Sequence, residues 1–411
     1  MTGAARRRAA ATLHVGAFLW AFASTLLGAA LPLINQELHL GYAASGSIFT
    51  VSSAGFLIGS LLSGALSTRV SGRILLIASI GALLPCLAAT AWVESYPALL
   101  TVVILAGIAG GGLTTVVNAT ISNLYAERRA SALSLLNVSF GGGALIAPLV
   151  SGAVIGQTDE WRPLYHVTSL LTLALLVLAI WWMPRAYDED SPDQPDEDVG
   201  QAPVRANWFT MRWALTFMAV FLAAAVEWGF AYWSATYFRD VLGSSAALAA
   251  NMVSLFWAGM LIGRLAFGGL LRRADPYRMV SVCAWSAIAA GTLLAANVGV
   301  AFSVVGAVLL GGSLAAVIPS LLALAIDKNP KASGAISGVL MFASGGGSLT
   351  APAIVGAIAD RSSLALAMWL IPALAAALLV VHLAGGDSRT SPLAVPGGGT
   401  VMHRERQRTA D

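Results

Sequence analysis

Charged side chains are scarce in this chain of 411 residues. Asp, Glu, Lys and Arg together make up only 10% of the sequence, and 57% of the residues are hydrophobic. Soluble domains carry about 25% charged residues and about 45–50% apolar residues. A water-soluble fold of this length could not bury so much apolar surface. The composition therefore excludes a soluble enzyme and predicts an all-α membrane protein with several spanning helices.

Cysteine and lysine are also rare, with two residues of each. Cys86 and Cys283 lie in apolar runs without metal-ligand spacing, so we expect small buried side chains and no disulfide framework. The sequence has no Gly-x4-Gly-Lys-[Ser/Thr] pattern, which excludes ATP as the energy source. Its five histidines form no cluster, and its net charge of +3 lies in short loops. We therefore expect no metal, no cofactor and no nucleic-acid partner.

Long hydrophobic runs dominate the rest of the chain. A membrane-spanning helix needs about 20 mostly apolar residues. The first run follows Arg6–Arg8 and is about 23 residues long, longer than the apolar core of about 7–15 residues in a signal peptide. We expect it to be retained as a helix. Twelve runs reach spanning length, near 12–34, 44–67, 74–93, 97–125, 130–155, 164–184, 208–238, 245–271, 279–297, 299–326, 333–359 and 362–384.

One polar segment divides these runs into six and six. Residues 185–207 contain seven acidic residues and three prolines, a composition typical of a disordered linker. The sequence thus predicts a six-helix bundle over 1–184 and a second over 208–385. Residues 386–411 are rich in Gly, Pro and Ser and are expected to form a disordered tail. One chain holds both bundles, so we expect a monomer.

The positions of Lys and Arg predict the orientation in the membrane. An even number of spans places both termini on one side, and that side collects 19 of the 23 basic residues. Only Arg162, Arg239 and Arg361 fall on the other side. Because basic loops stay in the cytoplasm, we expect both termini and the linker to be cytoplasmic. The expected location is the cell (inner, cytoplasmic) membrane, with the lipid bilayer as partner.

The two halves resemble each other at an offset of 204 residues. Residues 54–69 and 258–273 share nine of sixteen positions, and a Gly-Gly-Gly and Ala-Pro pattern recurs at 141–153 and 345–357. The halves are therefore one unit repeated in the same orientation. Such parallel repeats place a substrate site between the halves near mid-membrane. Pro148 and Pro352 each remove a backbone donor, which favours a bend at a gate.

Twelve helices in a parallel 6+6 repeat resemble the major facilitator superfamily, and the loop after the second helix is similar to its Gly-x3-Asp-Arg-x-Gly-Arg-Arg signature. Thr68, Ser71 and Gly72 depart from that signature, so the charge clamp between helices that it implies is not expected here. The gating residues that this resemblance and the repeat suggest are Gly64, Arg69, Arg73, Gly268 and Arg273, together with Pro148, Pro352 and Arg264.

Three stretches resemble the fucose–proton symporter group within that superfamily. They are FLWAFAST at 18–25, AVEWGFAYWSATY at 225–237 and SLFWAGMLIGRL at 254–265. The resemblance implies two further acids, which here are replaced by Gly28 and Thr114, so that group's proton pathway does not transfer to these positions. The fifth helix also approximates a Gly-x3-Gly-Pro-x2-Gly-Gly motif of proton-coupled exporters.

Glu227 is the only acid deep within a predicted span. A charge at mid-membrane costs about 2.5–3.5 kcal/mol on insertion scales, so such a residue persists where it has a use or a partner. Three interpretations are open. Glu227 could carry a coupling proton, it could contact the solute without coupling, or it could be a structural hydrogen-bonding group.

Aromatic and polar residues in the same helices are candidates for solute binding. Phe230, Ser234 and Tyr237 lie within about 80° of Glu227 at 100° per residue. Aromatic rings beside a carboxylate suit a polyol and also a drug-like cation, while ordinary interhelical packing is the alternative for each ring. The full predicted set is Phe230, Trp233, Ser234, Tyr237, Trp257, Thr114, Asn118 and Asn137.

These features together predict a secondary active transporter rather than an enzyme. The leading interpretation is proton-coupled movement of a small, sugar-like organic solute by alternating access. The alternative is a proton-driven exporter of drug-like compounds or metabolites. A membrane-embedded enzyme would need a clustered nucleophile, base or metal site, which the sequence lacks.

Overall fold

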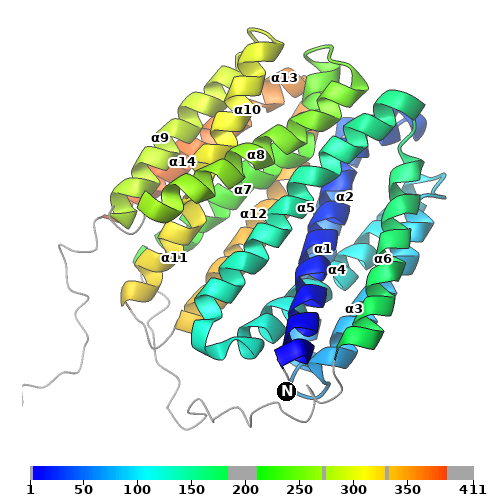
Figure 1. Cartoon of the computed structure of the whole chain (residues 1–411). Helices are drawn as coiled ribbons and strands as arrows, with labels where there is room; N and C mark the ends of the chain where they lie inside the picture. The colour runs from blue at the N-terminus through cyan, green and yellow to red at the C-terminus, as the bar shows by residue number, and fades with distance from the viewer. Residues whose placement is uncertain (1–2, 184–210, 271–274, 329–332, 387–411) are drawn as a thin grey trace, which may run out of the picture.

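A computed structural model of the chain describes residues 3–183, 211–270, 275–328 and 333–386. The predicted linker at 185–207 and nearly all of the predicted tail at 386–411 lie outside these ranges. Every regular element within them is a helix (Figure 1). The elements are α1 (Gly3–Glu37), α2 (Tyr42–Leu66), α3 (Gly72–Thr90), α4 (Tyr96–Leu124), η1 (Ala126–Arg128), α5 (Arg129–Thr158), α6 (Arg162–Trp182), α7 (Met211–Asp240), α8 (Ala246–Leu270), α9 (Pro276–Ala295), α10 (Val300–Leu314), α11 (Val317–Lys328), α12 (Ser333–Arg361), α13 (Leu364–Ala367) and α14 (Leu370–Ala384).

Twelve spans are long and apolar enough to cross a membrane, which confirms the number predicted from the sequence. Two of them are interrupted, a feature that the sequence analysis did not anticipate. The tenth span consists of α10 and α11, and the twelfth of α13 and α14. Pro319 and Pro372 follow the two interruptions by about one turn. A proline lacks the N–H that would bond the carbonyl four residues earlier, so each helix breaks at that point.

The spans form two bundles that lie side by side, α1–α6 and α7–α14 (Figure 1). Within the first, α2 packs on α4 and α1 on α5, and within the second, α8 packs on α10 and α7 on α12. The bundles meet where α2 contacts α12, α5 contacts α8 and α1 contacts α7. We call the end of the molecule that holds Gly3 and Ala384 the terminal end, and the opposite end the distal end.

Glycines set the closest helix crossings, and they do so at equivalent places in both bundles. A Cβ atom on Gly55 of α2 would collide with the Ile104 carbonyl of α4. In the second bundle, a Cβ on Gly259 of α8 would collide with the Val308 carbonyl of α10. Gly259 and Val308 lie 204 residues after Gly55 and Ile104, respectively. The sequence repeat is therefore a repeat of packing, in which absent side chains let backbones approach.

The packing role of these glycines can be tested with a single methyl group. A Cβ on Gly59 of α2 would overlap the Ile108 backbone of α4, whereas a Cβ on Gly81 of α3 would meet nothing within 4 Å. We expect Gly59→Ala to destabilise the protein by about 1–3 kcal/mol because the helices must move apart. Gly81→Ala should be neutral or slightly stabilising, because alanine favours a helix over glycine. Thermal unfolding in detergent micelles compares the two, and equal melting temperatures would contradict this account.

Candidate functional site

The two halves are joined along two seams that match each other. In one seam, the Thr50 hydroxyl of α2 donates to the Leu349 carbonyl of α12 at 2.9 Å. In the other, the Ser254 hydroxyl of α8 donates to the Leu145 carbonyl of α5 at 2.7 Å. Both residues of the first bond are displaced by 204 from their equivalents in the second. The pseudo-symmetry of the chain therefore extends to the hydrogen bonds between its halves.

A proline explains why one carbonyl is available in the α2–α12 seam. Pro352 in α12 has no N–H, so the Ser348 carbonyl one turn earlier lacks its helical donor. The Ser53 hydroxyl of α2 donates to that carbonyl at 3.3 Å. Pro148 occupies the equivalent position in α5, but there the position equivalent to Ser53 is Trp257. One predicted bend proline thus exposes a backbone acceptor that the opposite half satisfies.

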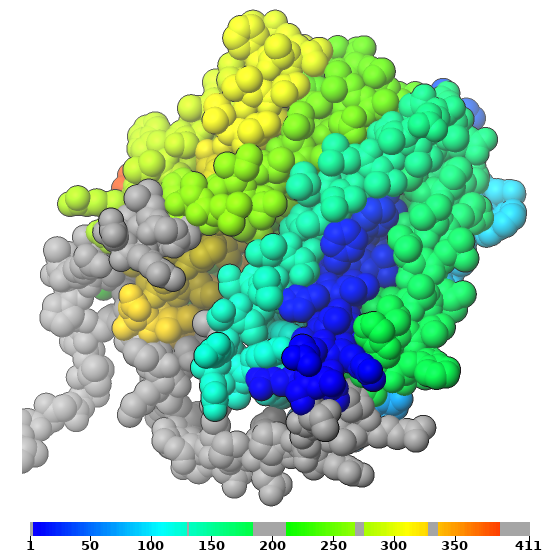
Figure 2. Space-filling model, viewed as in Figure 1, coloured from blue at the N-terminus to red at the C-terminus, as the bar shows by residue number. Residues whose placement is uncertain are grey.

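Both seams end at the same height in the molecule. Leu57 of α2 packs against Gly345 of α12, and Leu261 of α8 lies beside Gly141 of α5. The side chains one turn farther toward the terminal end are exposed. In the α2–α12 seam, Leu61 is 64% exposed and Met341 is 58% exposed. In the α5–α8 seam, Asn137 and Leu265 are exposed. Figure 2 shows the terminal ends of α5 and α11 apart on the side of the N-terminus. The bundles are therefore joined at the distal end and separated at the terminal end.

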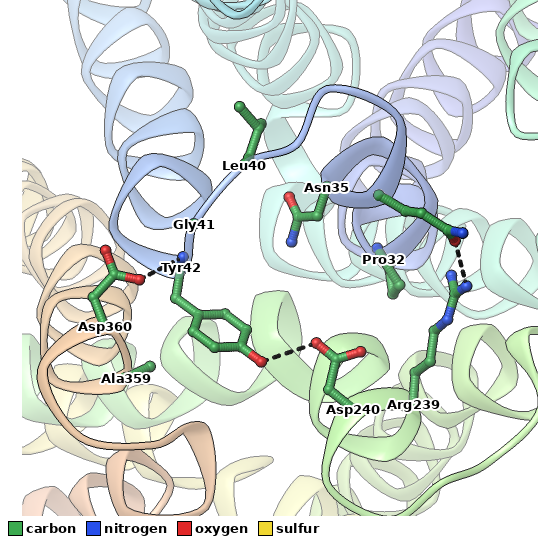
Figure 3. Close-up of a pocket in the computed structure, with 10 residues that line it drawn as sticks. Pro32, Asn35, Leu40, Gly41, Tyr42, Arg239, Asp240, Ala359 and Asp360 are labelled. Carbon is green, nitrogen blue, oxygen red and sulfur yellow. Dashed lines mark hydrogen bonds between the residues drawn. The ribbon is translucent and has the colours of Figure 1, made fainter.

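Polar contacts close the distal end (Figure 3). Tyr42, the first residue of α2, donates its backbone N–H to Asp360 of α12 at 2.7 Å and its hydroxyl to Asp240 of α7 at 3.1 Å. Arg239 donates to the Gln36 side chain of α1 at 2.7 Å. These contacts line a recess of about 560 Å³, formed by Pro32, Asn35, Gln36, Leu40, Gly41, Tyr42, Arg239, Asp240, Ala359 and Asp360.

An aromatic layer lies between this recess and the centre of the molecule. Phe49 of α2 stacks on Tyr232 of α7, with ring centroids 4.1 Å apart and planes 9° apart. The rings of Tyr42 and Trp233 meet edge to face at 5.9 Å. Since each pair joins one half to the other, the layer is a barrier that must open before a solute could pass the distal end.

Glu227 lies near this barrier, on α7. It is 9% exposed and is the only acid among the buried residues that the structure describes. Arg264 of α8, an exposed residue, is close enough to interact with it electrostatically. Trp228 lies next to Glu227 and contacts both Tyr232 and Trp257, with centroids 5.1 and 5.7 Å apart. A carboxyl group, a guanidinium group that interacts with it, and a cluster of aromatic rings in tilted and edge-to-face contact therefore lie in the second half.

Seven buried side-chain polar atoms in the described part of the chain have no hydrogen-bonding partner, and two of them belong to predicted binding residues. One is the indole Nε1 of Trp257, and the other is the hydroxyl of Thr114 on α4. Leaving a buried donor unpaired costs about 1–3 kcal/mol. Both residues belong to the predicted binding set, and an incoming polar solute is one way to satisfy them.

Four of the predicted binding residues are held in packing contacts, three of them inside the second half and Trp233 also against Tyr42 and Phe49 of the first half. Phe230 contacts Phe256 at 5.3 Å, and Trp233 donates to the Pro352 carbonyl at 3.0 Å. Ser234 donates to the Ala231 carbonyl at 3.1 Å in its own helix, and Tyr237 to the Leu294 carbonyl of α9 at 2.8 Å. All four side chains are fully buried. A role in binding stays a prediction for them.

The polar residues predicted in the first half do not gather around one point. Asn118 is half-buried on α4 and donates to the Thr114 carbonyl at 2.8 Å in its own helix. Asn137 is exposed on α5, just past the end of its seam. Each remains available to a solute from the terminal end, but the structure does not bring either into contact with Glu227.

The predicted gating residues have varied surroundings. Arg73 donates to the carbonyls of Ile180 and Met183 at 3.0 and 2.9 Å, so it caps the end of α6 within the first half. Gly64 and Arg69 are exposed at the terminal end of α2. Gly268 belongs to α8, and Arg273 lies outside the described residues.

Sequence reasoning missed Trp228, Tyr232 and Phe49. The helical wheel centred on Glu227 selected the side of α7 that carries Phe230 and Tyr237. Trp228 and Tyr232 lie four residues apart on another face, which is the spacing of neighbours on one helix surface. That spacing of two large aromatics was a signal in the sequence. For Phe49 the sequence contained no such signal, because its partner Tyr232 is brought to it only by the contact between α2 and α7.

The comparisons with known proteins agree with this architecture. The model of the Major Facilitator Superfamily matches residues 13–352, so the chain belongs to that superfamily. A glucose/galactose transporter of Brucella abortus is 27% identical over 384 residues, covering 89% of this chain and 90% of the relative. The match to the protein TsgA of Escherichia coli is 26% identical but covers only 62% of that relative, and the match to a TsgA homolog of Erwinia tasmaniensis covers 44% of it.

Two solved structures share the fold at low sequence identity. The nucleoside transporter NupG superposes with a TM-score of 0.74 at 14% identity, covering 93% of this chain and 98% of that one. A bacterial homolog of the human lysosomal transporter Spinster, in an inward-facing and occupied conformation, gives a TM-score of 0.76 at 16% identity, covering 95% and 98%. The protein is thus a multi-pass membrane transporter of the major facilitator fold rather than an enzyme.

The open and closed ends can be distinguished by cysteine labelling. In a chain with Cys86→Ser and Cys283→Ala, we expect Leu61→Cys and Met341→Cys to react with a water-soluble maleimide from the terminal side, because the seam has ended there. Thr50→Cys should react at least about tenfold more slowly from either side, since it lies in the closed seam. Comparable labelling rates at all three positions would contradict the described closure.

Proposed function

We propose that this transporter moves a small, uncharged, polyhydroxylated solute, sugar-like in character, by proton-coupled alternating access. The observation that carries the proposal is that Glu227, the buried acid, interacts with the cation Arg264 on a helix whose next residue, Trp228, contacts the ring of Trp257. The alternative hypothesis, a proton-driven exporter of drug-like compounds or metabolites, needs the same fold. The direction of transport and the transported solute distinguish the exporter from the proposed sugar transporter.

The proton is assigned to Glu227 for a physical reason. A carboxylate deep in a bilayer is costly, and a protonated carboxyl group removes that cost. Arg264 is the competing counter-ion, because a nearby positive charge favours the ionised form. Glu227 can therefore alternate between a charge-compensated state beside Arg264 and a neutral, protonated state. A proton moving through 100 mV releases about 2.3 kcal/mol, enough to drive such a cycle.

The chemistry around Glu227 supports a polyhydroxylated solute. Trp228 and Trp257 offer aromatic faces on which the C–H faces of a sugar can stack, and the unpaired Trp257 Nε1 can donate to a hydroxyl. A carboxyl group accepts from hydroxyls in either protonation state. The relatives and structures named above include a glucose/galactose transporter and a nucleoside transporter. Both named solutes carry several hydroxyl groups.

We further propose that the terminal end faces the cytoplasm, because it holds Gly3 and Ala384 and so corresponds to the side to which the sequence assigns 19 of 23 basic residues. The protein would then occupy the cell membrane as a monomer, with its centre open to the cytoplasm in this conformation. Pro148 and Pro352 are assigned to bending during opening. Domain limits at 184 and 208, with a cytoplasmic linker and tail, complete the proposal.

The test is transport in proteoliposomes with Glu227→Gln. The wild-type protein should accumulate a labelled solute against its gradient when a proton gradient and a potential of 100 mV are imposed. With one proton per neutral solute, the potential alone supports an accumulation of at most about 50-fold, and the pH gradient multiplies that limit. In Glu227→Gln, the ratio of internal to external solute should stay near one. Solute exchange between equal pools should stay within about threefold of the wild-type rate, since exchange needs no net proton transfer.

The matched control is Glu94→Gln, at an exposed acid in the distal loop between α3 and α4. It should behave as wild type. The solutes are D-glucose, D-galactose, L-fucose and uridine, with a cationic dye as the alternative. Loss of both exchange and accumulation in Glu227→Gln would make Glu227 a solute ligand without coupling. Unchanged accumulation would remove it as the coupling site, and transport of the dye alone, outward, would favour the exporter.

A further inference from the structure

The two halves differ at one place where their helices begin. α8 is preceded by Ser245, whose hydroxyl accepts the backbone N–H of Leu248 at 3.2 Å. Such a side chain caps the free N–H groups at a helix start. The equivalent residue before α2, 204 positions earlier, is Gly41, which has no side chain and makes no cap. α8 therefore caps itself, and α2 cannot.

α2 receives its cap from the other half of the molecule. The first free N–H of the helix belongs to Tyr42, and it donates to Oδ1 of Asp360 on α12 at 2.7 Å (Figure 3). The position equivalent to Asp360 in the first half is Gly156, on α5. The α2–α12 seam thus contains Gly41 and the capping residue Asp360, and the α5–α8 seam contains Gly156 and the capping residue Ser245. Asp360 caps a helix of the other half, whereas Ser245 caps its own helix.

The position of Asp360 within its own helix supports this assignment. It is the penultimate residue of α12, where the negative end of the helix dipole disfavours an acid. At the start of α2 the same carboxylate meets the positive end of a dipole, which favours it. Its electrostatic benefit therefore arises only when the two halves are in contact.

We propose that Asp360 is a helix cap supplied in trans, which holds the distal end of the transporter closed. When the halves separate at that end, α2 loses its only described cap, so opening carries the cost of an uncapped helix. Tyr42 strengthens the same contact through its separate bond to Asp240.

The hydrogen bond of Asp360 can be tested by substitution at that position. Asp360→Ala removes the trans cap and leaves the Tyr42 N–H without it in both states. Asp360→Asn keeps an acceptor oxygen, and asparagine caps a helix about as well as aspartate does. A serine at position 41 is no substitute, because the equivalent Ser245 accepts from the third residue of its helix, Leu248, and not from the first.

The distal opening can be measured as a distance between spin labels. Glu94 and Val298 are equivalent exposed positions in the distal loops of the two halves. We expect Glu94→Cys/Val298→Cys, labelled in a background of Cys86→Ser and Cys283→Ala and reconstituted in lipid nanodiscs, to show a short distance for the closed state and a longer one for the open state. No solute is needed, so the result is independent of the solute and proton proposals.

Asp360→Ala should raise the ratio of open to closed molecules about tenfold, which corresponds to about 1.4 kcal/mol. Asp360→Asn should stay within about threefold of the wild-type ratio, because the acceptor is kept. Glu160→Gln, at an exposed acid of the same end, should leave the ratio unchanged. The proposal is overturned if Asp360→Ala leaves the ratio unchanged, or if Asp360→Asn shifts it as far as Asp360→Ala does.

Discussion

A membrane-spanning helix must satisfy its own backbone polar groups, because the surrounding hydrocarbon offers none. α5 and α12 break this rule at Pro148 and Pro352, where a donor is missing. In α12 the freed Ser348 carbonyl accepts from Ser53 of the opposite half, and the neighbouring carbonyls Leu349 and Leu145 accept from Thr50 and Ser254 across the two seams. The arrangement makes the contact between halves part of the hydrogen bonding of each helix. A conformation that separates the seams must then find other donors, such as water or the transported solute.

This dependence links the seams to the centre of the molecule. Trp233 also donates to the Pro352 carbonyl, and its ring contacts both Phe49 and Tyr42. The bend in α12 is therefore in contact with the aromatic barrier. Glu227 lies less than two turns from Trp233 on the same helix, so a change in its charge acts on an element that already touches both seam and barrier. If Glu227 carries the proton as proposed, α7 itself connects it to the gate.

The sequence was sufficient for the spans, the repeat and the family, because each depends on composition or on spacing along the chain. Glu227 was also recognisable, since one acid in a span needs no structure to be noticed. The directions of side chains around it were not. Phe230 and Tyr237 fill contacts with Phe256 and α9 that no helical wheel contains. Trp228 acquires its place only from Trp257 on a neighbouring helix. The breaks before Pro319 and Pro372 were readable in principle, but proline within an apolar run is compatible with both a bend and a break.

The difference between the seams has a consequence for any duplicated transporter. Two identical halves would give two seams of equal strength, and opening at the distal end would strain both alike. Here the α5–α8 seam begins beside a helix that carries its own cap at Ser245, so separation there leaves its start satisfied. The α2–α12 seam begins at Gly41, whose helix depends on Asp360. The greater resistance to opening is therefore concentrated at one seam, the one whose residues also touch the barrier formed by Tyr42, Phe49 and Trp233. Divergence of a glycine and a serine after duplication is enough to give a symmetric fold an asymmetric gate.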